Sequence, residues 1–343
     1  MSYLDLIFGL FVIAFLAFAR IFRGQNNQGF GKDTTASIRG IAMIGIILHH
    51  IHSRFQGQSP ILAATGFLGT GIFFFISGYG NMLSINRRED SVKIDWFLKK
   101  LVKLYIPFFV AYWIYFCVLE LFYKDLVPSV KEILIDLVTA SLPNKDSWFI
   151  KIILLCFLVH WIAKNLFSDC FKQNLFIFVV IAIYVIVMWR MHVKTQWYTS
   201  PICYPIGCIV AKPKLLNKIL TYLKEKKVFS FVIFLLAFFA AMVLTRKIWA
   251  VTLVCPVLLS LACYYFSFIF EVKTRFLSWI GNNSFEFYIL HYACLQGFYN
   301  LYDINKLYYT IGVLLSACAL VYIYLFVKGR IMSLSGKNIR KAG

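Results

Sequence analysis

Arg39 and His50 stand eleven positions apart in SIRGIAMIGIILHHIHSRF, residues 37–55, a largely apolar stretch. Eleven residues of α-helix make three turns plus about 20°, so both side chains would share one face, about 16 Å apart along the axis. A guanidinium can bind phosphate, and a neutral imidazole can accept or release a proton. The pair is therefore a candidate anion-binding and acid–base site. The alternative is that Arg39 only flanks a membrane span and His50 is a hydrogen-bonded interior residue.

Two further histidines of this stretch, His49 and His52, would not lie on the face shared by Arg39 and His50. His49 would point about 100° away from His50, and His52 lies further round the helix. This angular spread argues against joint ligation of a metal ion by the three rings. The nine cysteines are scattered without a CxxC pair, so we expect neither a metal site nor a structural disulfide.

A second pair of ionisable groups, Glu286 and His291, lies five residues apart in the apolar stretch 278–296. Asparagines and a serine just before Glu286 can cap a helix there, and the helix dipole favours a carboxylate in the first turns. We expect Glu286 to pair with Arg39 or with a lysine of segment 96–110. A glutamate and a histidine inside one span favour function over packing.

Two neighbouring segments could serve a long anionic ligand. GFLGTGIFFFISGYGNML, residues 66–83, is rich in glycine; such a helix either packs closely against other helices or gives an acyl or pantetheine arm room to lie. WFLKKLVKLYIPFFV, residues 96–110, carries Lys99, Lys100 and Lys103 just before an apolar run. These lysines either contact lipid phosphates or bind the phosphates of a ligand.

The elements that position these residues are membrane-spanning helices. The chain of 343 residues is 61% hydrophobic and 15% charged, its mean hydropathy is +0.75, and a soluble domain would be about a quarter charged. Its apolar runs are continuous and without strand alternation, which predicts an all-α polytopic bundle. We expect about eleven spans, near residues 3–22, 37–53, 61–83, 101–123, 148–166, 174–191, 197–211, 228–245, 248–269, 285–301 and 308–327.

The net charge of +20 does not indicate a nucleic-acid partner, because the basic residues follow the membrane topology. With alternating loops, 25 of the 35 Lys and Arg side chains fall on one side, which the positive-inside rule makes cytoplasmic. The N-terminus would then lie outside and the C-terminus inside. The basic segment 212–227 is expected to form an amphipathic stretch on the anionic inner leaflet.

Six stretches resemble, in order, the motifs of the integral-membrane acyltransferase family 3. IRGIAMIGIILHH is similar to the family motif of an arginine, ten residues and a histidine, which falls on Arg39 and His50. GTGIFFFISGYG resembles its Gly-x-x-x-Phe-Phe-x-x-Ser-Gly-Phe/Tyr segment, and IGNNSFEFYILHYACL its C-terminal signature around His291. The other three are FLKKLVKLYIPFFV, with lysines where arginine is usual, DSWFI and YPIGCIVAK.

The resemblance implies transfer of an acyl group, most often acetyl, from cytoplasmic acyl-CoA to a hydroxyl of a surface carbohydrate or lipid-linked sugar. It implies that Arg39 binds CoA phosphates and that His50 is a general base or a transient acyl carrier. His291 and Glu286 would orient His50 or the thioester carbonyl. The expected setting is a bacterial plasma membrane, with membrane lipid as a partner and no metal.

Further site residues follow from the same motifs. Donor-binding residues would be Ser77, Lys99, Lys100 and Lys103, and substrate-binding residues would be Trp148, Tyr79 and Tyr288. Trp148 is equally explained by an interfacial aromatic belt, and we expect His160 to be structural. The implied organisation is an extra N-terminal helix and loop (1–34), the acyltransferase core (35–330) and a basic tail (331–343).

A transporter or flippase of a polysaccharide precursor is the competing hypothesis. Its interior would also hold buried Arg, Glu and His, acting as a proton relay. Inverted repeats with broken helices would favour it, and the sequence shows no such symmetry. A sensor or scaffold has little support, because the polar residues of interest lie inside spans rather than in loops.

Overall fold

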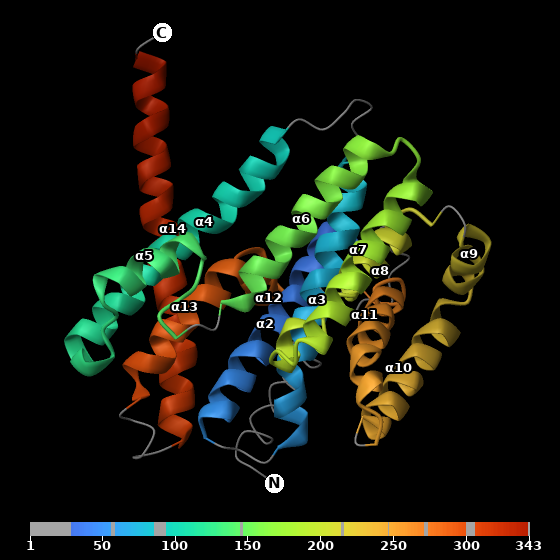
Figure 1. The fold of residues 1–343 in the computed structure, drawn as a ribbon, viewed down its shortest axis with the longest axis horizontal. Coiled ribbons are helices and arrows are strands. Elements are labelled where there is room, and N and C mark those ends of the chain that lie inside the picture. Colours follow the sequence, from blue (N-terminus) through green and yellow to red (C-terminus); the bar gives the residue numbers. More distant parts are fainter. Residues whose placement is uncertain are drawn as a thin grey trace. The chain divides into compact units, whose positions relative to one another are not determined.

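The structure, a computed structural model, describes residues 29–55, 59–85, 94–144, 147–213, 216–245, 247–270, 274–299 and 306–341. In these ranges the chain forms α-helices with short 3-10 turns and no β-strand, which confirms the all-α prediction (Figure 1). The expected first span, residues 3–22, lies outside the described residues.

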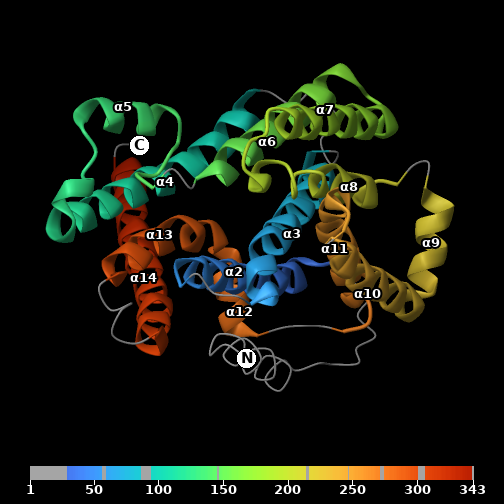
Figure 2. The same cartoon turned by 60° about the horizontal axis from the view of Figure 1, so that its bottom comes forward.

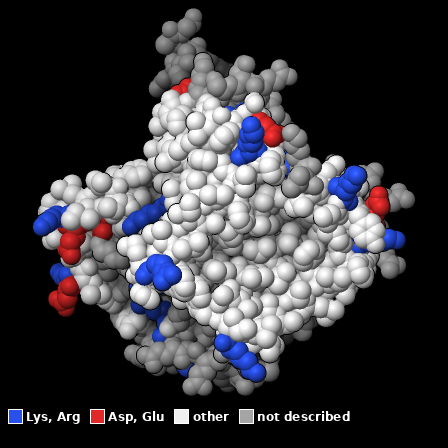
Figure 3. Space-filling view, turned by 45° about the vertical axis from the view of Figure 1, so that its right-hand side comes forward, with Lys and Arg blue, Asp and Glu red and all other residues white. Residues whose placement is uncertain are grey.

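Eight of the described helical segments are long and apolar enough to cross a membrane, so this is a multi-pass membrane protein. In α10 only 17% of the most apolar 18-residue stretch is buried inside the protein, as expected for a helix that faces lipid. Uncharged side chains cover most of the face seen in Figure 3. The eight segments are α2 (Lys32–Arg54), α3 (Pro60–Ile85), α4 (Ile94–Phe122), α6 (Trp148–Leu166), α7 (Cys170–Arg190), α10 (Lys227–Leu244), Trp249–Phe266, which comprises η3 (Trp249–Leu253) and α11 (Cys255–Phe266), and the Lys306–Ile331 part of α14 (Lys306–Lys341).

Two expected spans are short helices in the structure. Segment 197–211 contains only the nine-residue α8 (Cys203–Ala211), and nine residues rise about 14 Å against a hydrocarbon core of about 30 Å. Pro201 lacks an N–H group and precedes α8, which explains the break before that helix. Segment 285–301 contains the 14-residue α13 (Ser284–Gly297).

The chain divides into two compact units, each described here by itself. The first comprises Met1–Tyr105 and Lys145–Asn282, and the second comprises Ile106–Asn144 and Asn283–Gly343. The division falls within α4, two residues before Pro107. A proline inside a helix removes one backbone hydrogen bond and clashes with the preceding turn, so the continuity of α4 is weakest at this point.

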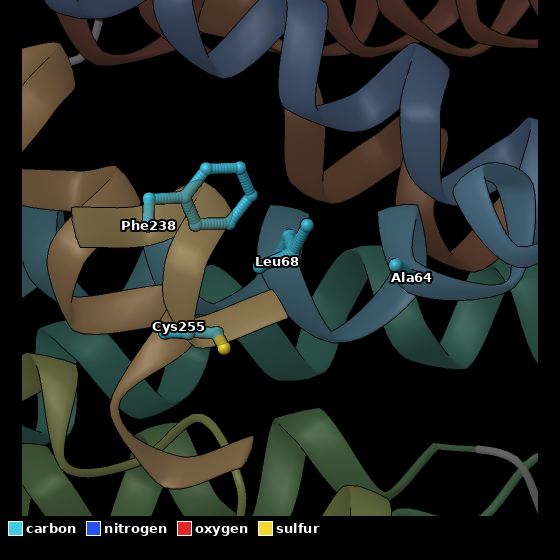
Figure 4. Close-up of a cluster of buried hydrophobic side chains, with 5 residues drawn as sticks. Ala64, Leu68, Phe238 and Cys255 are labelled. Atoms are coloured by element: carbon cyan, nitrogen blue, oxygen red, sulfur yellow. The ribbon is translucent and has the colours of Figure 1, made fainter. Parts of the chain in front are cut away.

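In the first unit, α3 packs against α2, α8 and α11, while α12 (Arg275–Asn282) covers α2 and α10 lies along α11 (Figures 1 and 2). One apolar cluster joins α3, α10 and α11 and comprises Ala64, Leu68, Phe238, Ala241 and Cys255 (Figure 4). These contacts make α3 the central helix of the first unit.

Glycines bring the helix backbones into close contact with α3. Gly66 faces the ring of His49 on α2, and a side chain there would collide with that ring. Gly78 lies against the backbone carbonyl of Tyr204, and Gly207 on α8 lies against the carbonyl of Phe75. Neighbouring helices thus fill much of the glycine-rich face of 66–83, which favours helix packing over an acyl-chain surface.

A short amphipathic helix, α9 (Asn217–Glu225), lies within the basic segment 212–227. Its Ile219 and Tyr222 are exposed, while the Lys224 ammonium lies over the rings of Tyr264 and Phe268, 5.8 and 5.6 Å from the two centroids. Burial lowers the pKa of Lys224. The cation–π contacts tie α9 to the end of α11.

The second unit contains the rest of α4, α5 (Val130–Val138), α13 and α14. A capping box starts α5: the Ser129 hydroxyl accepts a hydrogen bond from the backbone N–H of Glu132, whose carboxylate accepts one from the backbone N–H of Ser129. The Tyr309 hydroxyl donates to the Leu295 carbonyl at 2.9 Å and joins α14 to α13. The segment expected as a tail continues α14 as helix to Lys341.

Gly78→Ala should destabilise the protein, because the new methyl group would overlap the Tyr204 carbonyl and force α3 and α8 apart. Overpacking of this kind costs about 1–3 kcal/mol or more. Gly80→Ala is the matched control, since nothing lies within 4 Å of a Cβ added there and alanine is the better helix former. Thermal unfolding in detergent should show a lower Tm for Gly78→Ala only; equal Tm values would contradict the α3–α8 contact.

Candidate functional site

Arg39 and His50 lie on one continuous helix, α2, without a proline or a break between them. Helical geometry therefore places them on the same face, three turns apart, in agreement with the sequence prediction. Both side chains are partly buried. Of the most apolar 18-residue stretch of α2, 78% is buried inside the protein. The Arg39 Nε donates to the Thr35 carbonyl one turn earlier at 3.4 Å, so the guanidinium is anchored to its own helix.

The three histidines of α2 have different surroundings in the structure. The His49 Nδ1 donates to the Leu62 carbonyl at 3.2 Å, and its ring fills the space beside Gly66. His52 is buried, and neither ring nitrogen has a hydrogen-bond partner among the described residues. The rings of His49 and His50 meet edge to face at 5.2 Å. His49 thus packs α2 against α3.

The three expected lysines occupy different environments. Lys99 and Lys103 are exposed. Lys100 is partly buried, and its ammonium donates to the Asn81 Oδ1 at 2.9 Å and lies 5.3 and 5.2 Å from the ring centroids of Trp96 and Phe157. Among the residues that the structure describes, Lys100 is the one of the three lysines with a side-chain hydrogen bond.

The sequence analysis missed the hydrogen-bond network to which Lys100 belongs. The Asn81 amide donates to the Tyr204 hydroxyl at 3.1 Å, and that hydroxyl lies 2.9 Å from the His160 Nδ1. Asn81 and His160 are polar residues in apolar runs, which is a recognisable signal. Tyr204 stands among many tyrosines, and nothing in the sequence marks it.

The aromatic candidates of the first unit are packed inside it. Tyr79 meets Phe30 at 5.0 Å and Tyr264 at 6.0 Å between ring centroids. Trp148 begins α6, is only 7% exposed and lies edge to face against Phe149. Ser77 is partly buried on α3.

In the second unit, Glu286 pairs with a residue that the sequence analysis did not consider. Its Oε1 lies 3.7 Å from the Lys328 Nζ on α14. The expected pairing with Arg39 or with a lysine of 96–110 stays a prediction. Glu286 meets Lys328 because α13 and α14 pack against each other and bring the start of one helix beside the end of the membrane segment of the other.

His291 is fully buried, and its Nδ1 donates to the Phe287 carbonyl at 3.0 Å. Because a carbonyl can only accept, the proton of the neutral ring is on Nδ1 and the lone pair on Nε2. The ring lies against Tyr292 at 4.2 Å and Tyr288 at 6.2 Å. His291 and Tyr288 thus form one aromatic group of the second unit.

The candidate residues fall into two sets. Arg39, His50, Ser77, Tyr79, the lysines and Trp148 belong to the first unit, and Glu286, Tyr288 and His291 belong to the second. Among the residues that the structure describes, no three His, Cys, Asp or Glu side chains lie close enough to hold a metal ion.

A family model described as an acyltransferase domain matches residues 37–326. The chain therefore belongs to this acyltransferase family, and it is a membrane acyltransferase. The match begins two residues before Arg39 and extends beyond His291, so it includes every candidate residue above. Comparison with curated proteins and with solved structures found no match. The family favours an enzyme over the transporter hypothesis.

Glu286→Gln should lower the free energy of unfolding by less than about 1 kcal/mol, because Lys328 is half-exposed and solvent screens the pair. Lys328→Met should do the same, and the double variant should be no worse than either single one. Chemical denaturation in detergent measures this, with Glu120→Gln on the exposed face of α4 as the control. Strictly additive losses would mean that the two side chains do not interact.

Proposed function

We propose that this acyltransferase moves an acyl group, with acetyl as the expected one, from acyl-CoA to a hydroxyl of a cell-surface carbohydrate or a lipid-linked sugar. The observation that carries the proposal is the placement of Arg39 and His50 on one face of the unbroken helix α2. A phosphate-binding cation and a proton acceptor about 16 Å apart match a ligand with phosphates at one end and a reactive thioester at the other.

In the proposed reaction His50 accepts the proton of the acceptor hydroxyl as its oxygen attacks the thioester carbonyl. A new C–O bond forms, the C–S bond breaks, and the CoA thiolate leaves and takes the proton from the His50 imidazolium. General-base catalysis of this kind contributes a factor of about 10²–10⁴. The acyl group could instead rest briefly on His50 before it passes to the hydroxyl.

Arg39 is the proposed anchor of the donor phosphates. Its planar guanidinium can bind a phosphate with two parallel hydrogen bonds, which a lysine cannot do. The basic segment 96–110 is proposed to supply further positive charge, with Lys99 and Lys103 exposed and Lys100 held by Asn81. The expected orientation, with these groups on the cytoplasmic side, agrees with the location of acyl-CoA in the cell.

The resemblance of the segment around His291 to the family signature is the basis for proposing roles for His291 and Glu286. The Nδ1–H···O=C bond of His291 fixes its tautomer, so Nε2 is the nitrogen able to accept a hydrogen bond. We propose that His291 is a catalytic residue that acts through Nε2, and that Glu286, through Lys328, maintains the start of α13. Trp148, Tyr79 and Tyr288 are the proposed acceptor-side aromatic residues, and Ser77 is a proposed donor contact.

His50→Ala should reduce acyl transfer by about 10²–10⁴-fold, because the hydroxyl proton loses its acceptor. The measurement is the O-acetyl signal in NMR spectra of surface glycans from cells that carry each variant, at matched protein levels. His192→Ala, which changes an exposed histidine outside the spans, is the control and should leave the signal intact. A normal signal with His50→Ala would rule out the assignment. Unchanged esters with accumulated lipid-linked precursor in cells without the gene would support a transporter.

Arg39→Ala and Arg39→Lys should both raise the KM for acyl-CoA, by about tenfold or more for alanine. Lysine retains the charge and loses the paired hydrogen bonds, so it should restore the affinity only in part. Initial rates in membrane vesicles at varied acetyl-CoA concentration give KM and kcat separately. An unchanged KM in the alanine variant would exclude Arg39 from donor binding.

A further inference from the structure

A hydrogen-bonded chain of four side chains joins four helices of the first unit. The Lys100 ammonium on α4 donates to the Asn81 Oδ1 on α3 at 2.9 Å. The Asn81 Nδ2 donates to the Tyr204 Oη on α8 at 3.1 Å, and that oxygen lies 2.9 Å from the His160 Nδ1 on α6. We call these four residues the Lys100 network.

The direction of two bonds in the Lys100 network is fixed. An ammonium can only donate, so Asn81 must present its oxygen to Lys100 and its NH₂ group to Tyr204. The Tyr204 oxygen accepts that bond, and the donor between this hydroxyl and the His160 Nδ1 depends on the imidazole tautomer. Asn81 therefore turns the negative end of its amide dipole toward Lys100, and hydrogen-bonded chains of this kind strengthen their members mutually.

Packing of the four helices alone would not require the polar side chains of the Lys100 network. Asn81, His160 and Tyr204 are buried, and buried polar groups destabilise a protein unless they are hydrogen-bonded. Apolar side chains of similar size would join the helices without that cost. The rings of Trp96 and Phe157 also lie beside the ammonium. Asn81 and the two rings thus surround one cation, the Lys100 ammonium, and Tyr204 and His160 bond in turn to Asn81 and to each other.

We propose that Asn81, Tyr204 and His160 are positioning residues that hold the Lys100 ammonium as a fixed cation for a phosphate of the acyl donor. An ammonium has three N–H donors, and one of them binds Asn81, so two can face a ligand. Lys100 is partly exposed, which gives an anion access to it. Lys99 and Lys103 would supply mobile charge, whereas Lys100 supplies charge at a defined position. This inference rests on the proposed function.

A double-mutant cycle of Tyr204→Phe and Lys100→Met tests the inference. Tyr204→Phe removes one hydroxyl and breaks the network at its centre. We expect it to raise the KM for acetyl-CoA about three- to tenfold with kcat unchanged, in line with the loss of about one hydrogen bond. Lys100→Met should raise KM at least as much, and the double variant should match Lys100→Met, because the network then has no cation to hold.

Tyr265→Phe is the matched control. Tyr265 is also fully buried in the first unit, and its hydroxyl has no hydrogen-bond partner among the described residues. This variant should leave KM unchanged. A purely structural network would instead give additive effects of Tyr204→Phe and Lys100→Met, with kcat and the amount of folded protein falling together, and that result would overturn the inference.

His160 offers a second pair of variants if Tyr204→Phe does not fold. His160→Gln retains a hydrogen-bonding group for the Tyr204 hydroxyl and should keep a KM near that of the unmodified protein, whereas His160→Leu should raise it. Equal KM values for the two would contradict the positioning role.

Binding of CoA to the purified protein separates this inference from the proposed function. If the unmodified protein neither binds CoA nor transfers an acyl group, the proposed function fails. If it binds CoA, and Tyr204→Phe binds CoA equally well, only the positioning role fails. Weaker CoA binding by Tyr204→Phe and unchanged binding by Tyr265→Phe would support the positioning role.

Discussion

Close approach of helix backbones is the constraint on which the first unit depends. Helices in a membrane gain little from burying apolar side chains against one another, because the lipid is equally apolar; contact surface and hydrogen bonds hold them together instead. Gly66 and Gly78 allow α2 and α8 to reach the backbone of α3, and Gly207 does the same from α8. These contacts set the spacing of α2, α3 and α8, and with it the positions of the side chains that these helices carry.

The polar groups inside the first unit are arranged by the same packing. The α3–α8 contact at Gly78 and Gly207 lies within a few residues of Asn81 and Tyr204, so it sets the distance over which these two side chains bond. The α2–α3 contact uses the ring of His49, while His50 is one residue, about 100°, further round α2. Adjacent histidines thereby lie in different surroundings, and only the ring of His49 fills the space beside Gly66.

The sequence predicted the features that depend on local periodicity. The helical nature of the chain, the same-face placement of Arg39 and His50, and the family follow from patterns within single segments. It did not predict which residues meet across helices. The pairing of Glu286 with Lys328 depends on α13 packing on α14, and the partner of Lys100 depends on α3. The short α8 was missed because hydropathy continues through the break before it.

The glycines of α3 differ in how their neighbours could change during evolution. Beside Gly66 stands a side chain, the ring of His49, so a larger residue at position 66 becomes possible once position 49 becomes smaller. Relatives of this chain should therefore show these two positions varying together. Beside Gly78 stands the main chain of Tyr204, which every amino acid shares. No substitution elsewhere can make room there, so glycine at 78 should persist wherever the two helices cross in this way.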